Sequence, residues 1–98
     1  MKIGVPTEVK PGEGRVATLP AQAEALVRDG IPVTIQSGAG TASDISDQNY
    51  LDAGAEIVAS GEAVYAAADL IVKVKEIMPE EYSFLRPEHV IFTNVHGA

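Results

Sequence analysis

Short apolar runs alternate along the chain with longer segments in which apolar positions recur at helical spacing. Runs rich in valine and isoleucine predict five strands, at residues 2–6, 31–36, 55–58, 69–76 and 89–95. A helix is expected between each strand and the next, over roughly residues 18–30, 46–54, 60–68 and 79–85.

The expected helix ends carry residues typical of caps. Thr18 is a candidate amino-terminal cap for the first helix, which has Pro20 in its first turn and ends at Gly30. Ser46 or Asp47 opens the second helix, and Ser60 caps the third.

Strict alternation of strand and helix predicts an α/β domain of the doubly wound, Rossmann-like or flavodoxin-like kind. Its sheet would be mainly parallel, with right-handed crossovers and helices on both faces. The chain of 98 residues is long enough for one domain with one core. In such sheets the functional groups gather beyond the carboxyl ends of the strands.

Three polar residues fall at that predicted edge. Arg15 lies in the loop after the first strand, Lys75 at the end of the fourth, and His96 directly after the fifth. A guanidinium, an ammonium and an imidazole brought to one edge would suit a small carboxylate ligand.

Each of the two cations also has a structural interpretation. Arg15 can grip a carboxylate with two parallel hydrogen bonds, or it can be a surface arginine paired with Glu8 or Glu13. Lys75 can contact a carbonyl or carboxylate oxygen, and it shares one strand face with Lys73. Both lysines can instead lie on a solvated face, which is the expectation for Lys73.

The two histidines are expected to differ in role. His96 is a candidate general acid or base, because an imidazole titrates near neutral pH, although it could also be a packing residue. His89 opens the last strand at the opposite edge and is interpreted as structural. Since the two histidines lie at opposite strand ends, no shared metal site is expected.

Composition removes several classes of protein. The formal net charge is −7, which disfavours a nucleic-acid binder. The absence of cysteine excludes disulfides and thiolate sites, and it suits a cytoplasmic location. No apolar run is long enough to span a membrane, and the start of the chain has no signal-peptide pattern.

The stretch "SGAG" resembles part of a dinucleotide-binding fingerprint but does not complete it. Gly38 and Gly40 provide G-x-G, whereas Ser43 stands at the third glycine position. Glu62, at the distance of the fingerprint acid, opens a helix instead of ending a strand. We therefore interpret the stretch as a loop and expect no coenzyme site in this chain.

Several motifs in this order carry a family resemblance that covers nearly the whole chain. The segments "IGVPTEVKPGEGRVATLP", "VTIQSGAG", "AGAEIV", "DLIVKVKE" and "FTNVH" resemble the amino-terminal substrate domain of alanine dehydrogenase. The amino-terminal domain of the nicotinamide nucleotide transhydrogenase alpha subunit is also similar. Saccharopine dehydrogenases resemble this pattern more distantly.

The resemblance implies a reaction and a role for each candidate residue. In an alanine dehydrogenase, L-alanine, NAD and water give pyruvate, ammonia and NADH. Arg15 would bind the substrate carboxylate, Lys75 would contact substrate oxygens, and His96 would be the acid–base group. The resemblance also implies a homo-oligomer. Transhydrogenase relatives usually lack the second lysine of "KVK" and the histidine, which favours the dehydrogenase branch.

The sequence departs from the family in two places. Ile77 and Met78 precede Pro79, where relatives commonly have proline directly after "KVKE". The chain also stops at "HGA", without the NAD domain and the carboxyl-terminal segment of the family. We therefore expect residues 1–98 to be an incomplete substrate domain, inactive alone, with NAD bound by a domain not in this chain. The competing hypothesis is a stand-alone, non-catalytic module for carboxylate binding or assembly.

Overall fold

A computed structural model describes residues 1–93 of the chain and shows one five-stranded sheet, in which all paired strands are parallel. The strands are β1 (Ile3–Val5), β2 (Val33–Gln36), β3 (Glu56–Val58), β4 (Leu70–Lys73) and β5 (Val90–Thr93). The helices are α1 (Pro20–Arg28), α2 (Asp47–Asp52) and α3 (Gly61–Ala67), and the short 3₁₀ helices are η1 (Thr41–Ser43) and η2 (Pro79–Phe84). The predicted doubly wound α/β fold is confirmed.

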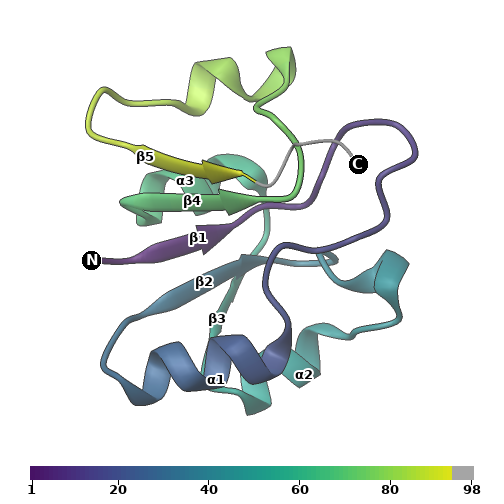
Figure 1. Cartoon of the computed structure of the whole chain (residues 1–98), viewed down its shortest axis with the longest axis vertical. Helices are drawn as coiled ribbons and strands as arrows, with labels where there is room; N and C mark the ends of the chain where they lie inside the picture. Colours follow the sequence, from purple (N-terminus) through teal and green to yellow (C-terminus); the bar gives the residue numbers. More distant parts are fainter. Residues whose placement is uncertain (94–98) are drawn as a thin grey trace.

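The strand order places a change of winding direction at β1. The order across the sheet is β3-β2-β1-β4-β5, so the chain first builds outward from β1 on one side and then returns to its other side. Figure 1 shows the strand arrows pointing the same way, toward the edge from which the long loop after β1 emerges. Open α/β sheets bind ligands at such a switch point, beyond the carboxyl ends of the strands. Here that place lies between the loops after β1 and β4.

Each face of the sheet has its own apolar cluster. On the face covered by α1 and α2, Val5 and Ile35 pack with Ala23 and Tyr50. On the other face, Ile71 packs with Val64 and Tyr65 of α3. Gly4 lets α3 lie close to β1, because a Cβ there would come within 2.7 Å of Val64 and Ala68 side-chain atoms. Both faces are therefore covered, as the alternating sequence pattern predicts.

Helix capping follows the prediction at two helices and departs from it at the first. The hydroxyl groups of Ser46 and Ser60 accept hydrogen bonds at the starts of α2 and α3. The prediction for Thr18 is wrong, because Leu19 is the cap position of α1. Thr18 is buried, and its carbonyl accepts a 2.6 Å hydrogen bond from the Tyr50 hydroxyl. Pro20 is the first helical residue.

The fourth strand is shorter than predicted, and one of its lysines is placed differently. β4 ends at Lys73 instead of residue 76. The expectation of a solvated Lys73 is wrong, since the residue is 1% exposed. Two carboxylates within ion-pair distance supply the partners that a buried ammonium needs. Lys75 lies two positions beyond the strand, where the chain no longer follows the sheet.

Among the described residues, no helix combines the length and the apolar character needed to cross a membrane.

Candidate functional site

The loop after β1 contains a tight turn. Lys10, Pro11, Gly12 and Glu13 form this turn, closed by a 3.1 Å hydrogen bond from Glu13 N to the Lys10 carbonyl. Proline presets the first central position, and Gly12 takes a φ of 86°, which residues with side chains rarely adopt. The turn delivers Glu13 and Arg15 to the carboxyl edge of the sheet.

Two contacts hold this loop against its neighbours. The Ser43 hydroxyl, at the end of η1, donates a 2.7 Å hydrogen bond to the Gly14 carbonyl. On the other side, Lys10 Nζ lies 3.0 Å from Glu76 Oε2, just after β4. The loop is thereby fixed between the segments that follow β2 and β4.

Arg15 makes a forked contact with the carboxylate of Glu13. Its Nε and Nη2 donate to Oε2 and Oε1 at 2.9 and 3.0 Å, and its backbone N–H donates to Oε2 at 2.7 Å. This is the two-bond geometry by which a guanidinium recognises a carboxylate. Of the two surface partners considered for Arg15, Glu13 is the one that it contacts.

Lys75 approaches the same carboxylate from the other loop. Its Nζ lies 4.0 Å from Glu13 Oε1, and its side chain remains 24% exposed. Arg15 and Lys75, sixty residues apart in the chain, line one hollow of about 590 Å³. The hydrogen bonds from Arg15, with its charge and that of Lys75, lower the pKa of Glu13 to about 2. Two of the three predicted residues therefore meet around one carboxylate.

A second group of charges is buried inside the protein. Lys73 Nζ is 3.1 Å from Glu8 Oε1 and 3.3 Å from Glu81 Oε2. The side chains of all three are at most 4% exposed. The Tyr65 hydroxyl donates a 2.8 Å hydrogen bond to Glu81, and burial, followed by this bond, raises the pKa of Tyr65.

Glu8 joins the buried group to the open hollow. Its carboxylate accepts hydrogen bonds from the backbone N–H groups of Val74 and Lys75, at 2.8 and 3.2 Å. These bonds hold the chain directly after the end of β4 at Lys73. Glu8 therefore sets the position from which the Lys75 side chain leaves the backbone.

The two histidines have different outcomes. His89 is structural, as predicted: its Nδ1 accepts from Arg86 N at 2.9 Å, and its Nε2 lies 2.8 Å from the Tyr65 carbonyl. His96 lies three positions after the last residue of β5 and outside the described residues. Its predicted role stays a prediction.

The "SGAG" loop is closed by its own hydrogen bonds. The N–H of Gly38 donates to Asp47 Oδ1 at 2.9 Å, and those of Ala39 and Thr41 donate to nearby carbonyls. The first of these bonds, with one from the Ser37 hydroxyl, lowers the pKa of Asp47. A dinucleotide diphosphate needs free N–H groups at such a turn. The N–H groups of Gly38, Ala39 and Thr41 are therefore not available to that group.

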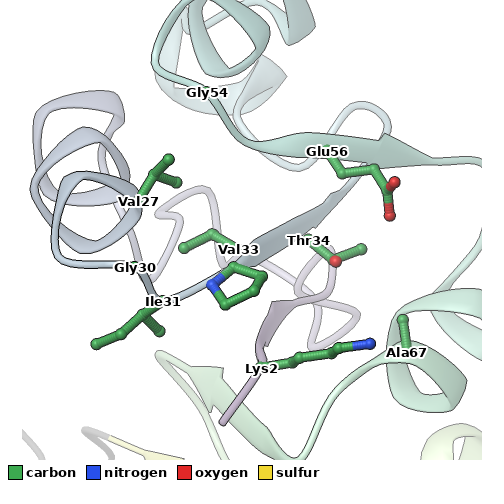
Figure 2. A pocket seen from close by; sticks show the side chains of 10 residues that line it. Lys2, Val27, Gly30, Ile31, Val33, Thr34, Gly54, Glu56 and Ala67 are labelled. Atoms are coloured by element: carbon green, nitrogen blue, oxygen red, sulfur yellow. The ribbon is translucent and has the colours of Figure 1, made fainter.

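Another hollow, of about 500 Å³, lies at the opposite edge of the sheet. Figure 2 shows it between Lys2, Thr34 and Glu56, which lie at or next to the amino ends of β1, β2 and β3. Its walls include Val27 and Ile31. It lies away from the switch-point edge, where sheets of this class place their sites. The candidate site is therefore the hollow around Glu13.

Within residues 1–93, no group of three or more histidine, aspartate or glutamate side chains could hold a metal ion.

Sequence reasoning missed the importance of the acidic residues. Glu8 and Glu13 were considered only as surface partners of Arg15, and Glu81 and Tyr65 were not considered. The signal available for Glu13 was its place between two glycines beside an arginine. The buried partners gave no local signal, because they come from segments 65 and 8 residues away from Lys73.

The fold and the hollow define a parallel α/β domain with a carboxylate-holding pair of cations at its switch point. Comparison with known proteins agrees with this class. Residues 4–98 match the family described as alanine dehydrogenase/PNT, N-terminal domain. The chain belongs to this family.

Curated relatives include several alanine dehydrogenases. The chain is 47% identical to the enzyme of Mycolicibacterium smegmatis and 45% identical to that of Methanococcus maripaludis. In both cases the match covers 100% of this chain and 26% of the relative. The chain therefore spans about a quarter of the length of these proteins.

Solved structures agree on the fold and also include the second branch of the family. An L-alanine dehydrogenase superposes with a TM-score of 0.92 at 39% identity, over 95% of this chain and 26% of that one. A transhydrogenase from Sinorhizobium meliloti superposes with a TM-score of 0.86 at 33% identity, over 95% and 27%.

Proposed function

We propose that the chain is the substrate-binding part of an NAD-dependent alanine dehydrogenase. The relatives named alanine dehydrogenase support the reaction, and the hollow at the switch point supports the kind of substrate. The observation that carries the proposal is the placement of Arg15 and Lys75 around a single carboxylate. Alanine and pyruvate each carry one carboxylate of this kind.

In the proposed site, the substrate carboxylate takes the position beside Arg15 that the Glu13 carboxylate holds. The fork of N–H donors fixes the orientation of the substrate, because two parallel bonds define a plane. Lys75, on the other side of the hollow, donates to the oxygen on C2 of pyruvate and neutralises charge that develops there. His96 exchanges the proton on that oxygen or on the nitrogen that replaces it.

NAD accepts the hydride in this reaction, and we assign its binding to a domain outside these 98 residues. The "SGAG" loop is consistent with that assignment, since the N–H groups of Ser37, Gly38 and Ala39 are engaged within the protein. The chain alone is then expected to bind the substrate but not to turn it over. An assay of NADH formation from L-alanine should be positive for the full-length protein and negative for residues 1–98. Turnover by the short chain would contradict this assignment.

The role of Arg15 is tested by Arg15→Lys in the full-length protein. Lysine keeps the charge but loses the fork, so the KM for pyruvate should rise about tenfold or more. Arg28→Lys is the matched control, because Arg28 pairs with Glu24 on the exposed face of α1, 3.4 Å away. An unchanged KM in Arg15→Lys, or an equal rise in the control, would argue against the proposed site.

A transhydrogenase-type function is the second candidate, supported by the structure from Sinorhizobium meliloti. The two functions differ in their substrates. A dehydrogenase forms NADH from alanine, whereas a transhydrogenase transfers hydride between two nicotinamide nucleotides without an amino acid. Measuring both reactions with the full-length protein separates them.

A further inference from the structure

The hollow already contains a carboxylate, and that carboxylate belongs to the protein. Glu13 fills the Arg15 fork with two side-chain bonds, at 2.9 and 3.0 Å, and lies 4.0 Å from the Lys75 ammonium. Its side chain is only 5% exposed, although Arg15 itself is 64% exposed. A substrate carboxylate and Glu13 therefore need the same donors.

We propose that Glu13 is a specificity-determining residue, which holds Arg15 in the unliganded site and, when displaced, keeps a negative charge that excludes dicarboxylic 2-oxo acids. The inference rests on the proposed function, because it takes Arg15 and Lys75 as the groups that bind the substrate. In this proposal, Glu13 makes the site favour substrates with one carboxylate over substrates with two.

Displacement of Glu13 needs only a local movement. Glu13 stands between Gly12 and Gly14, where the backbone is not tightly packed: a Cβ on Gly12 would meet nothing within 4 Å, and one on Gly14 would meet Ala42 at 3.6 Å. Two flanking contacts of the loop, at Lys10 and at the Gly14 carbonyl, do not involve the Glu13 side chain. The Glu13 side chain can therefore leave the fork while these two contacts stay in place, although it gives up the 2.7 Å bond from the Arg15 backbone N–H.

The charges of the hollow match one carboxylate. The charged residues that line the hollow are Lys10, Glu13, Arg15 and Lys75. Because Lys10 is paired with Glu76, Arg15 and Lys75 together with Glu13 leave one positive charge for the ligand. Glu13 stays ionised above about pH 2, so this balance holds at neutral pH. A second carboxylate on the ligand would have no cation of its own there and would meet the charge of the displaced Glu13. The Lys10 ammonium is engaged with Glu76, 3.0 Å away.

Two variants of Glu13 separate two effects: its competition with the substrate carboxylate for Arg15, and the repulsion of a second carboxylate by its negative charge. Glu13→Gln removes the negative charge and weakens the grip on Arg15, whereas Glu13→Asp keeps the charge on a shorter side chain. Glu24→Gln is the control, because Glu24 also pairs with an arginine but lies on the exposed face of α1. Thermal unfolding of each full-length variant confirms that the fold is retained.

The ligands are pyruvate, 2-oxobutyrate and freshly prepared oxaloacetate, titrated calorimetrically into the full-length protein. Oxaloacetate carries a carboxylate where 2-oxobutyrate carries a methyl group, so the pair isolates the second charge. In Glu13→Gln, pyruvate should bind about three- to tenfold tighter, as expected when one like charge is removed a few ångströms away in a partly solvated hollow. The gain for oxaloacetate should exceed the gain for 2-oxobutyrate by a similar factor, and Glu13→Asp should not show that excess.

The outcomes distinguish this inference from the proposed function. If the wild-type protein binds pyruvate and Arg15→Lys weakens it, the proposed function holds. If Glu13→Gln then leaves pyruvate affinity unchanged or lowers it, the idea that Glu13 competes with the substrate for Arg15 is overturned. Equal gains for oxaloacetate and 2-oxobutyrate overturn the charge-based exclusion. Failure of the wild-type protein to bind pyruvate overturns the proposed function itself, and the inference with it.

Discussion

Lys73 and Lys75 stand two positions apart in the sequence and lie in opposite environments. Lys73, the last residue of β4, has a fully buried side chain between two buried carboxylates. Lys75, just past the strand, has a side chain that is 24% exposed and faces one carboxylate across an open hollow. The same residue type thus serves a fixed buried cluster in one case and a solvent-accessible site in the other.

The difference shows what burial does to an ion pair. In the interior, each charge has lost its hydration, so a missing partner leaves an uncompensated charge. In the hollow, the side chains of Arg15 and Lys75 are 64% and 24% exposed, so water can replace the carboxylate partner of these two cations at small cost. The buried cluster is suited to holding the loops in place, and the open group is suited to binding and releasing a ligand.

The strongest test of this comparison is to remove the charge of each lysine in turn. Lys73→Met should lower the free energy of unfolding by about 3–5 kcal/mol, because it leaves two buried carboxylates without their cation. Lys75→Met should lower it by less than about 1 kcal/mol, as for an exposed ion pair. Urea unfolding of both variants measures the contrast. Similar losses in the two variants would contradict the distinction between the regions.

A smaller effect is expected from the edge of the buried cluster. Tyr65→Phe removes the 2.8 Å hydrogen bond to Glu81 and should lower the free energy of unfolding by about 1–3 kcal/mol, as for a hydrogen bond to a charged group. Because the folded protein raises the pKa of Tyr65 above its ordinary value of 10.0, this stabilisation is complete below pH 10. It is lost as the pH rises toward the folded pKa.

The measurement is urea unfolding of the wild type and Tyr65→Phe at neutral and alkaline pH. The stability difference between them should narrow above pH 10. A difference that stays constant into the alkaline range would show that the tyrosine hydroxyl is not held in its neutral form by the fold.

The smallest expected effect concerns the open group at acidic pH. The pKa of Glu13 falls from 4.5 to about 2 on folding, chiefly through its bonds with Arg15. Its stabilising contribution is therefore complete above pH 4.5 and is lost as the pH falls through about 2. The stability difference between the wild type and Glu13→Gln, measured by urea unfolding, should shrink over that interval. A difference independent of pH would mean that Glu13 and Arg15 are not paired in solution.

Much of the fold followed from local patterns. Alternating strands and helices predicted the parallel α/β sheet, and Ser46 and Ser60 marked the starts of two helices correctly. Boundaries were less accurate where distant contacts intervene. Thr18 is not the cap of α1, and its carbonyl instead accepts a hydrogen bond from Tyr50, 32 positions away. β4 ends at Lys73, and the next two N–H groups bind Glu8, which is 66 and 67 positions away.

Part of the candidate site was predictable because it depends on the topology of the sheet. Topology alone placed Arg15 and Lys75 at one edge, and the structure brings them to one hollow. The burial of Lys73 was not predictable, because a charged residue at the end of a strand is usually solvated and its partners are distant in sequence. His96 lies outside the described residues, so its predicted role stays a prediction.

By itself, the sequence determined the order of elements, the direction of the strands and the cations that reach the carboxyl edge, because these depend on periodicity and on chain connectivity. Only the tertiary structure decided which lysine is buried, which carboxylate each cation meets, and that Glu13 occupies the Arg15 fork. Those outcomes depend on contacts across many residues, where burial and desolvation outweigh local preference.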